Sequence, residues 1–183
     1  MSDPEPPEVV ERAFEASEAF DSTDGGYALS TTVFETAVTA TAIGDGTATA
    51  IDDGTATATE DGPAARFHAS IWLPTLDAAV AGEPVPAVVE DGWFETLDRR
   101  LQDAFSVAQT DGETEPVLER DEGVVRVRLT YAPPTARQGV ADAKTLIEFV
   151  EGTYAQGIIP GYEYRGPAAT LVERASNAGG SGR

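Results

Sequence analysis

Residues 124–131 alternate strictly between apolar and polar side chains, and this pattern constrains the fold more than any other feature. One side of the stretch carries Val125, Val127, Leu129 and Tyr131, while the other carries Arg126, Arg128 and Thr130. Successive side chains of a β-strand point to opposite faces, so this stretch predicts a half-buried strand of an antiparallel sheet. Residues 65–73 repeat the pattern, with Phe67, Ala69, Ile71 and Leu73 opposite Arg66, His68, Ser70 and Trp72.

Weaker periodicities place further elements around these two strands. Strand patterns cover 27–31, 33–43 and 117–120, and helical patterns cover 7–20, 76–80, 92–108, 135–154 and 167–176. Runs of strands separated by helices, without strict β-α alternation, are typical of an α+β fold. We therefore expect a single α+β domain over 7–176, with helices packed on one face of an antiparallel sheet built from a meander plus a hairpin. A chain of 183 residues suits one such domain. The flanks 1–6 and 177–183 are expected to be an acidic disordered tail and a flexible tail.

A short repeat interrupts this pattern. The segment Asp45-Gly46-Thr47-Ala48-Thr49-Ala50 recurs eight residues later as Asp53-Gly54-Thr55-Ala56-Thr57-Ala58. Asp-Gly favours a tight turn, and Thr-Ala alternation has the period of a strand. Since Ala and Thr bury little apolar area, we expect a hairpin insertion over 44–60 at an edge of the sheet or protruding from it.

The charge is extreme. Asp and Glu number 32 against 12 Lys and Arg, giving a formal net charge of −20, and Lys144 is the only lysine. Such a charge repels itself in dilute buffer, whereas molar salt shortens the Debye length to about 3 Å. The composition resembles that of haloarchaeal proteins, which work in a salt-rich cytoplasm. A DNA mimic or a cation buffer is the competing explanation of the same charge.

The sequence lacks the residues that several classes of functional site require. The chain has no cysteine, and His68 is its only histidine, so thiolate sites are excluded and a zinc site would need converging carboxylates. No serine has the Gly-x-Ser-x-Gly setting, and no glycine-rich phosphate loop occurs. We expect no cofactor and no metal, although Asp45, Asp52, Asp53 and Asp61 could meet around calcium.

The expected location is the cytoplasm, away from membranes and nucleic acids. No apolar run approaches the length of a membrane span, and the acidic N-terminus lacks the basic start of a signal peptide. Nucleic-acid binding needs a basic patch, and Arg126, Arg128, Arg137 and Arg165 are few and dispersed in the sequence.

Aromatic and arginine side chains provide the best candidate for a binding site. They are Tyr131, Arg137, Tyr162, Tyr164 and Arg165. Tyr and Arg often anchor interfaces. The alternative is structural: Tyr162 or Tyr164 clamps its loop onto the core through a hydroxyl bonded to backbone.

Two resemblances complete the reading. The stretches Gly92–Leu101 and Ile159–Tyr164, with the helical start near Phe14, resemble a haloarchaeal protein family of unassigned function, which implies no activity. The element order α-β-β-β-α-β-β-α over residues 8–154 resembles the fold of type III secretion chaperones and YbjN-like proteins. We therefore expect a non-enzymatic protein-interaction or chaperone-like module that binds a protein partner or itself. The alternative is an enzyme or small-ligand-binding protein that uses the loop Tyr162–Arg165.

Overall fold

The computed structural model describes residues 5–43 and 65–180. Its strands form one six-stranded sheet in the order β1-β2-β3-β4-β6-β5, and all neighbouring strands are antiparallel. They are β1 (Phe20–Thr23), β2 (Gly26–Leu29), β3 (Glu35–Ala42), β4 (Ala65–Pro74), β5 (Val117–Asp121) and β6 (Val124–Tyr131). The expected hairpin insertion over 44–60 and its aspartate turns lie outside the described residues, as do residues 1–4 and 181–183 of the two expected tails.

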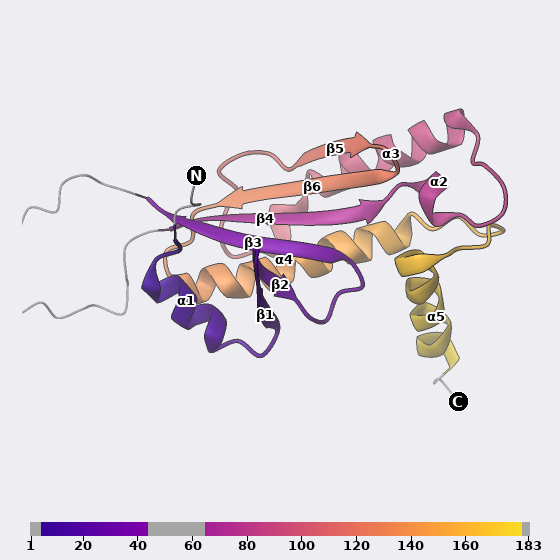
Figure 1. Cartoon of the computed structure of the whole chain (residues 1–183). Coiled ribbons are helices and arrows are strands. Elements are labelled where there is room, and N and C mark those ends of the chain that lie inside the picture. The colour runs from indigo at the N-terminus through magenta and orange to yellow at the C-terminus, as the bar shows by residue number, and fades with distance from the viewer. Residues whose placement is uncertain (1–4, 44–64, 181–183) are drawn as a thin grey trace, which may run out of the picture.

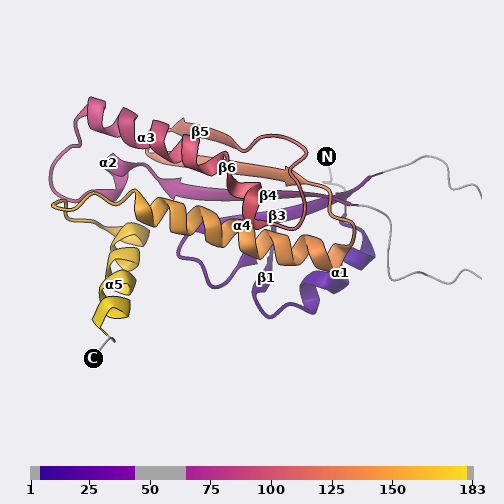
Figure 2. The ribbon, with the colours of Figure 1, turned by 180° about the vertical axis from the view of Figure 1, so that it is seen from behind.

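The helices lie on one side of this sheet (Figures 1 and 2). They are α1 (Glu8–Glu15), α2 (Leu76–Ala79), α3 (Ala87–Leu101), α4 (Ala136–Gln156) and α5 (Gly166–Gly180), with the 3-10 turn η1 (Ala104–Val107) after α3. Helices α3 and α4 lie along the face of the sheet, and α5 extends away from its end. This arrangement confirms the α+β class, the antiparallel sheet and the helices packed on one face.

The two alternating strands are neighbours at the centre of the sheet. Phe67 of β4 is paired with Tyr131 of β6, and their rings stack with centroids 5.5 Å apart. The apolar sides predicted for both strands are buried in the core between the sheet and the helices, and their polar sides are not buried. The strand prediction is therefore confirmed down to which residue faces which way.

Helix α4 crosses beneath the sheet and closes the core. The side chain of Thr135 accepts a hydrogen bond from the backbone N–H of Gln138, as expected of an N-cap residue. The apolar residues that recur at three- and four-residue steps along it are all buried: Val140, Ala143, Ile147, Val150 and Tyr154. Only its end was misplaced, since the helix continues for two residues beyond Tyr154.

The first predicted helix is too long. It ends at Glu15, and Phe20–Thr23 instead forms β1, which pairs with β2 across Asp24 and Gly25. The Phe20 ring packs edge-to-face on Phe14 at 5.2 Å, so tertiary packing and strand pairing outweigh the helical periodicity.

The helix predicted over 92–108 is also displaced. Helix α3 begins at Ala87 after Pro86 and ends at Leu101. A proline fixes its own φ and often precedes or opens a helix, which accounts for the start of α3 directly after Pro86. The last helix is longer than predicted and reaches Gly180.

Candidate interaction surface

The helices leave the second face of the sheet without cover, and we call this surface the open face. It consists of the outward side chains of the central strands and β5, namely Glu35, Ala37, Thr39, His68, Ser70, Trp72, Val117, Glu119, Val124, Arg126, Arg128 and Thr130. The open face follows directly from the alternation, because every second residue of these strands is committed to the core.

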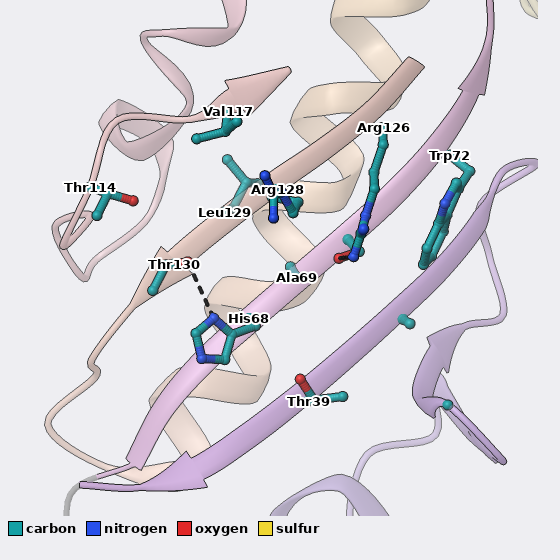
Figure 3. A pocket seen from close by; sticks show the side chains of 13 residues that line it. Thr39, His68, Ala69, Trp72, Thr114, Val117, Arg126, Arg128, Leu129 and Thr130 are labelled. Atoms are coloured by element: carbon teal, nitrogen blue, oxygen red, sulfur yellow. Dashed lines mark hydrogen bonds between the residues drawn. The ribbon is translucent and has the colours of Figure 1, made fainter. Parts of the chain in front are cut away.

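Strand pairing gathers these side chains around a shallow hollow of about 550 Å³ (Figure 3). Trp72 is paired with Arg126, Ser70 with Arg128, and His68 with Thr130. Thr114 and Val117 line the hollow on the β5 side, and Gly25 lines it on the β2 side. Residues more than 50 positions apart in the sequence thus form one surface.

Arg126 is held at the surface without a carboxylate partner. Its guanidinium carbon lies 5.4 Å from the ring centroid of Trp72, and its Nη2 lies 3.4 Å from the Ser70 hydroxyl. Within the described residues, no acidic side chain forms an ion pair with it. The indole and the hydroxyl orient a charge that remains available to a partner.

The two other arginines of this region are engaged. Arg128 donates to Glu119 at 3.0 Å, while its buried Nε has no hydrogen-bond partner among the described residues. Arg66 donates to Glu113 through two nitrogens, which lowers the pKa of the Glu113 carboxyl below its ordinary value. Arg126 is therefore the guanidinium on the open face that is freest to bind.

His68 lies in the middle of the hollow. Its Nδ1 is 3.3 Å from the Thr130 hydroxyl. Burial lowers the pKa of His68 below the ordinary 6.5, the positive charge of Arg66 lowers it further, and Glu113 partly opposes both. The ring is thus mostly neutral at pH 7, and it can accept or donate one hydrogen bond.

Apolar groups complete the surface. Val117 and Val124 are 41% and 40% exposed, which places them among the few large apolar side chains that reach solvent in the described chain. Together with the half-buried Trp72, they lie beside Arg126 and Arg128. An indole, two valines and a free guanidinium on an uncovered sheet face have the composition of a protein-binding surface.

The predicted set of aromatic and arginine residues does not form one site. Tyr131 is fully buried, and its hydroxyl donates to the Gly139 carbonyl oxygen at 2.7 Å. Arg137 is exposed in the first turn of α4, whereas the loop Tyr162–Arg165 follows the other end of that helix. The 21 residues of α4 span about 30 Å, which separates Arg137 from the loop.

Arg137 lines a groove between α1 and α4 with a volume of about 740 Å³. Arg12 and Lys144 lie on the same rim, and Val9 and Val140 are among the apolar residues of its wall. Arg12 and Lys144 are already paired with Glu8 and Glu148, the residues one helical turn away. The groove therefore offers one free cation, Arg137, among the described residues.

The loop Tyr162–Arg165 is bonded to the rest of the chain. The Tyr164 hydroxyl accepts from the Ile159 N–H at 2.8 Å and donates to the Ile159 carbonyl at 3.0 Å. Arg165 donates from Nε to the Ala78 carbonyl and from its backbone N–H to the Ala79 carbonyl. Tyr162 packs half-buried against the core. These contacts are those of the structural clamp that we considered as the alternative.

The sequence patterns identified the polar side of each strand, but not that the two polar sides lie together on one surface. The polar sides of both strands are evident from alternation, yet the arginines at 126 and 128 look dispersed until β6 is placed beside β4. The missing information was the strand order, because β4 pairs with β6 across two helices and β5. Two neighbouring strands with aromatic and arginine residues on their polar sides are the signal to look for.

Two further observations bear on function. Among residues 5–43 and 65–180, no three His, Cys, Asp or Glu side chains gather as a metal site would require. The aspartates at 45, 52, 53 and 61 lie outside those ranges. None of the helices in the described chain has the length and apolar character to cross a membrane.

Comparison with known proteins places the chain in a family without giving it an activity. No curated protein and no solved structure matches it. Residues 45–174, well over half of the chain, match a family described as a family of unknown function, DUF5813. The matched segment contains β4, β6 and the open-face residues His68, Trp72, Arg126 and Arg128. The chain therefore belongs to the DUF5813 family of unknown function.

Proposed function

We propose that this protein is a non-enzymatic protein-interaction module of a salt-rich cytoplasm, and that it docks a protein partner against the open face. The single observation that carries the proposal is the Arg126 guanidinium, which is oriented by Trp72 and Ser70 but has no carboxylate partner among the described residues. A partner that presents a carboxylate and apolar side chains fits this surface. Arg and Trp are the residue types that most often dominate binding at interfaces.

Charge favours a protein over a nucleic acid as the partner. The arginines on or beside the open face are Arg66, Arg126 and Arg128, and the acidic residues there include Glu35, Glu113 and Glu119. The surface has no positive excess, whereas nucleic-acid affinity depends on neutralising several phosphates. It is nevertheless far less acidic than a chain of net charge −20 would present on average. An acidic protein can approach this face with less repulsion than elsewhere.

The chaperone-like role and the halophilic, cytoplasmic setting belong to the same proposal. The excess of acidic residues supports a salt-adapted protein, because their mutual repulsion is weakest at high ionic strength. An uncovered sheet face beside a folded core supports a role in holding another chain.

The alternative, an enzyme or ligand-binding protein that uses Tyr162–Arg165, has less support. Both the Tyr164 hydroxyl and the Arg165 guanidinium are hydrogen-bonded to backbone groups of the chain itself. A ligand would have to displace these bonds before it could use either group.

Tryptophan fluorescence offers a direct test, because the chain has two tryptophans in different environments. Trp93 is only 7% exposed in the core, whereas Trp72 lies on the open face. In a Trp93→Phe background, Trp72 becomes the sole reporter. We would incorporate 5-hydroxytryptophan at this position, because it can be excited at longer wavelength than the tryptophans of added proteins, and titrate the labelled variant with fractions of native lysate in about 2 M KCl, where repulsion between acidic proteins is screened.

The proposal requires that a protein fraction shift the Trp72 emission and that the Arg126→Glu variant lose the shift. Arg137→Glu is the matched control, because it makes the same charge change on the helical side of the molecule. Loss of the shift in the control variant, or a shift produced only by protein-free nucleic acid or small-molecule fractions, would contradict the proposal.

A further inference from the structure

We propose that the partner of the open face is a second copy of this chain, so that two sheets pack face to face in a symmetric dimer. This inference rests on the proposed function, since it uses the same surface. It is carried by one row of paired residues that is complementary to itself.

The row runs across four strands, and its member on β5 is Glu119, which is paired with Arg126 but accepts its hydrogen bond from Arg128. Glu35 of β3 is paired with Trp72 of β4, and Trp72 is paired with Arg126 of β6. An acid and a base thus flank one tryptophan, each one strand away from it. Glu35 is exposed, and neither charged group has an ion-pair partner among the described residues.

A two-fold axis along β4 satisfies both charges at once. Rotation by half a turn about an axis parallel to β4, above Trp72, places the β3 side of one copy over the β6 side of the other. Glu35 of each copy then faces Arg126 of its partner, and the two indoles meet at the centre. A small tilt of this axis gives the angle of about −30° at which aligned sheets usually pack. The same contact is made twice, as an isologous interface requires.

The two neighbouring rows of the open face are compatible with the same two-fold rotation. Ala37, Ser70 and Arg128 form the next row, which places a small side chain opposite a long one. Thr39, His68 and Thr130 form the row after it, which places hydroxyl opposite hydroxyl. Because Ala37 and Thr39, the β3 members of these rows, carry no charge, no like charges meet across the axis within them while His68 is neutral.

The size of the face predicts a weak dimer. Four strands of about eight residues cover roughly 19 Å by 27 Å, or about 500 Å² per copy in projection. The total of about 1,000 Å² is below the 1,200–2,000 Å² of stable interfaces. We therefore expect a dissociation constant in the micromolar range, and full dimerisation only in concentrated solution.

Salt should strengthen this dimer, although its interface contains ion pairs. Each copy carries a net charge of −20, and that long-range repulsion opposes association far more than two local pairs favour it. At molar salt the repulsion is screened beyond about 3 Å, while the pairs in contact and the apolar burial remain. We therefore expect the association constant of the dimer to increase from low to high KCl.

The test is a charge exchange followed by sedimentation velocity in about 2 M KCl, over about 1 to 200 µM protein. Glu35→Arg alone places two arginines against each other, and Arg126→Glu alone places two acids against each other. Each single variant should weaken dimerisation at least tenfold. The double variant, Glu35→Arg with Arg126→Glu, restores the pairing in a reversed sense and should recover it. Circular dichroism would confirm that all three variants fold.

The outcomes separate this inference from the proposed function. A wild-type chain that stays monomeric at all these concentrations would overturn the dimer, as would a double variant that dimerises no better than the single ones. If Trp72 fluorescence still responds to a lysate protein through Arg126, the docking function stands with a different partner. If Trp72 responds neither to a second copy nor to any protein fraction, both proposals are wrong.

Discussion

Asp142 of α4 and Thr110 of the segment after η1 are joined by two hydrogen bonds inside the protein. The Asp142 Oδ2 accepts from the Thr110 hydroxyl at 2.5 Å and from the Thr110 N–H at 3.1 Å. The other oxygen accepts from the Gln109 N–H at 3.0 Å and the Gln138 Nε2 at 2.9 Å. Asp142 is only 2% exposed, so a buried carboxylate fixes the segment leading into β5 to the helix beneath the sheet.

Removal of that carboxylate should be costly. In Asp142→Ala, the buried N–H and hydroxyl of Thr110 and the part-buried N–H of Gln109 lose their acceptor, and an unsatisfied buried donor costs about 1–3 kcal/mol. We expect the free energy of unfolding to fall by about 3 kcal/mol or more, measured by urea denaturation at constant high KCl. Gln138→Ala is the control, since it removes one of the four bonds and should cost about 1 kcal/mol. Equal losses in both variants would show that the carboxylate does not act as a hub.

Gly139 allows α4 to approach the sheet. A Cβ atom at this position would lie 2.4 Å from the Phe67 ring and 2.8 Å from Pro133, and Phe67 is fully buried. Gly139→Ala should therefore cost about 2 kcal/mol or more in folding free energy, because the core cannot yield. Gly152→Ala, on the same helix with open space around its Cβ position, should instead stabilise by about 0.5–1 kcal/mol. Melting temperatures that move in the same direction in both variants would contradict this contrast.

The parts of the fold that depend on local pattern could be predicted, and the parts that depend on pairing could not. Alternation was enough to assign the buried faces of β4 and β6, and the helical pattern over 135–154 placed both ends of α4 within two residues. By contrast, Phe20 forms a strand because β2 and Phe14 lie beside it, which no local pattern records. The predicted binding residues lie apart for the same reason. Tyr131 alternates correctly into the core, whereas Arg126 matters only because β6 lies against β4.

The Tyr164 hydroxyl should act as a clamp rather than as a contact for a partner. Tyr164→Phe leaves the N–H and carbonyl of Ile159 without their partner, which should lower stability by about 1–2 kcal/mol. Tyr162→Phe is the control, because the Tyr162 hydroxyl forms no hydrogen bond among the described residues. It should be neutral within about 0.5 kcal/mol. Thermal melts beside size-exclusion chromatography test this, and an unchanged Tyr164→Phe melt with weakened association would favour a binding role for the loop.

His68 should make stability depend on pH below neutrality. Its pKa in the folded protein lies below the ordinary 6.5 because of burial and then of Arg66, with Glu113 opposing and Thr130 uncharged beside it. As the pH falls below 6.5, the unfolded chain takes up the proton first, so the folded state loses stability down to the folded pKa. His68→Gln lacks this proton uptake. The stability difference between wild type and His68→Gln should therefore move against the wild type from about pH 7 to pH 5. A difference that stays constant over this range would contradict the lowered pKa.

Salt should stabilise the fold over an unusually wide range. Only seven acidic residues form ion pairs in the described chain, and most of those pairs are partly or largely exposed, so they contribute little. The remaining acids repel one another at a net charge of −20. Ordinary surface repulsion is largely screened by about 0.15 M salt, where the Debye length is about 8 Å. A surface this dense in acids places like charges closer than that, so the melting temperature should continue to rise between about 0.1 and 2 M KCl.

A neutral osmolyte such as sucrose is the control, since it stabilises folded proteins without screening charge. A melting temperature that is flat in KCl would contradict the salt-adapted interpretation and favour an acidic surface that mimics DNA.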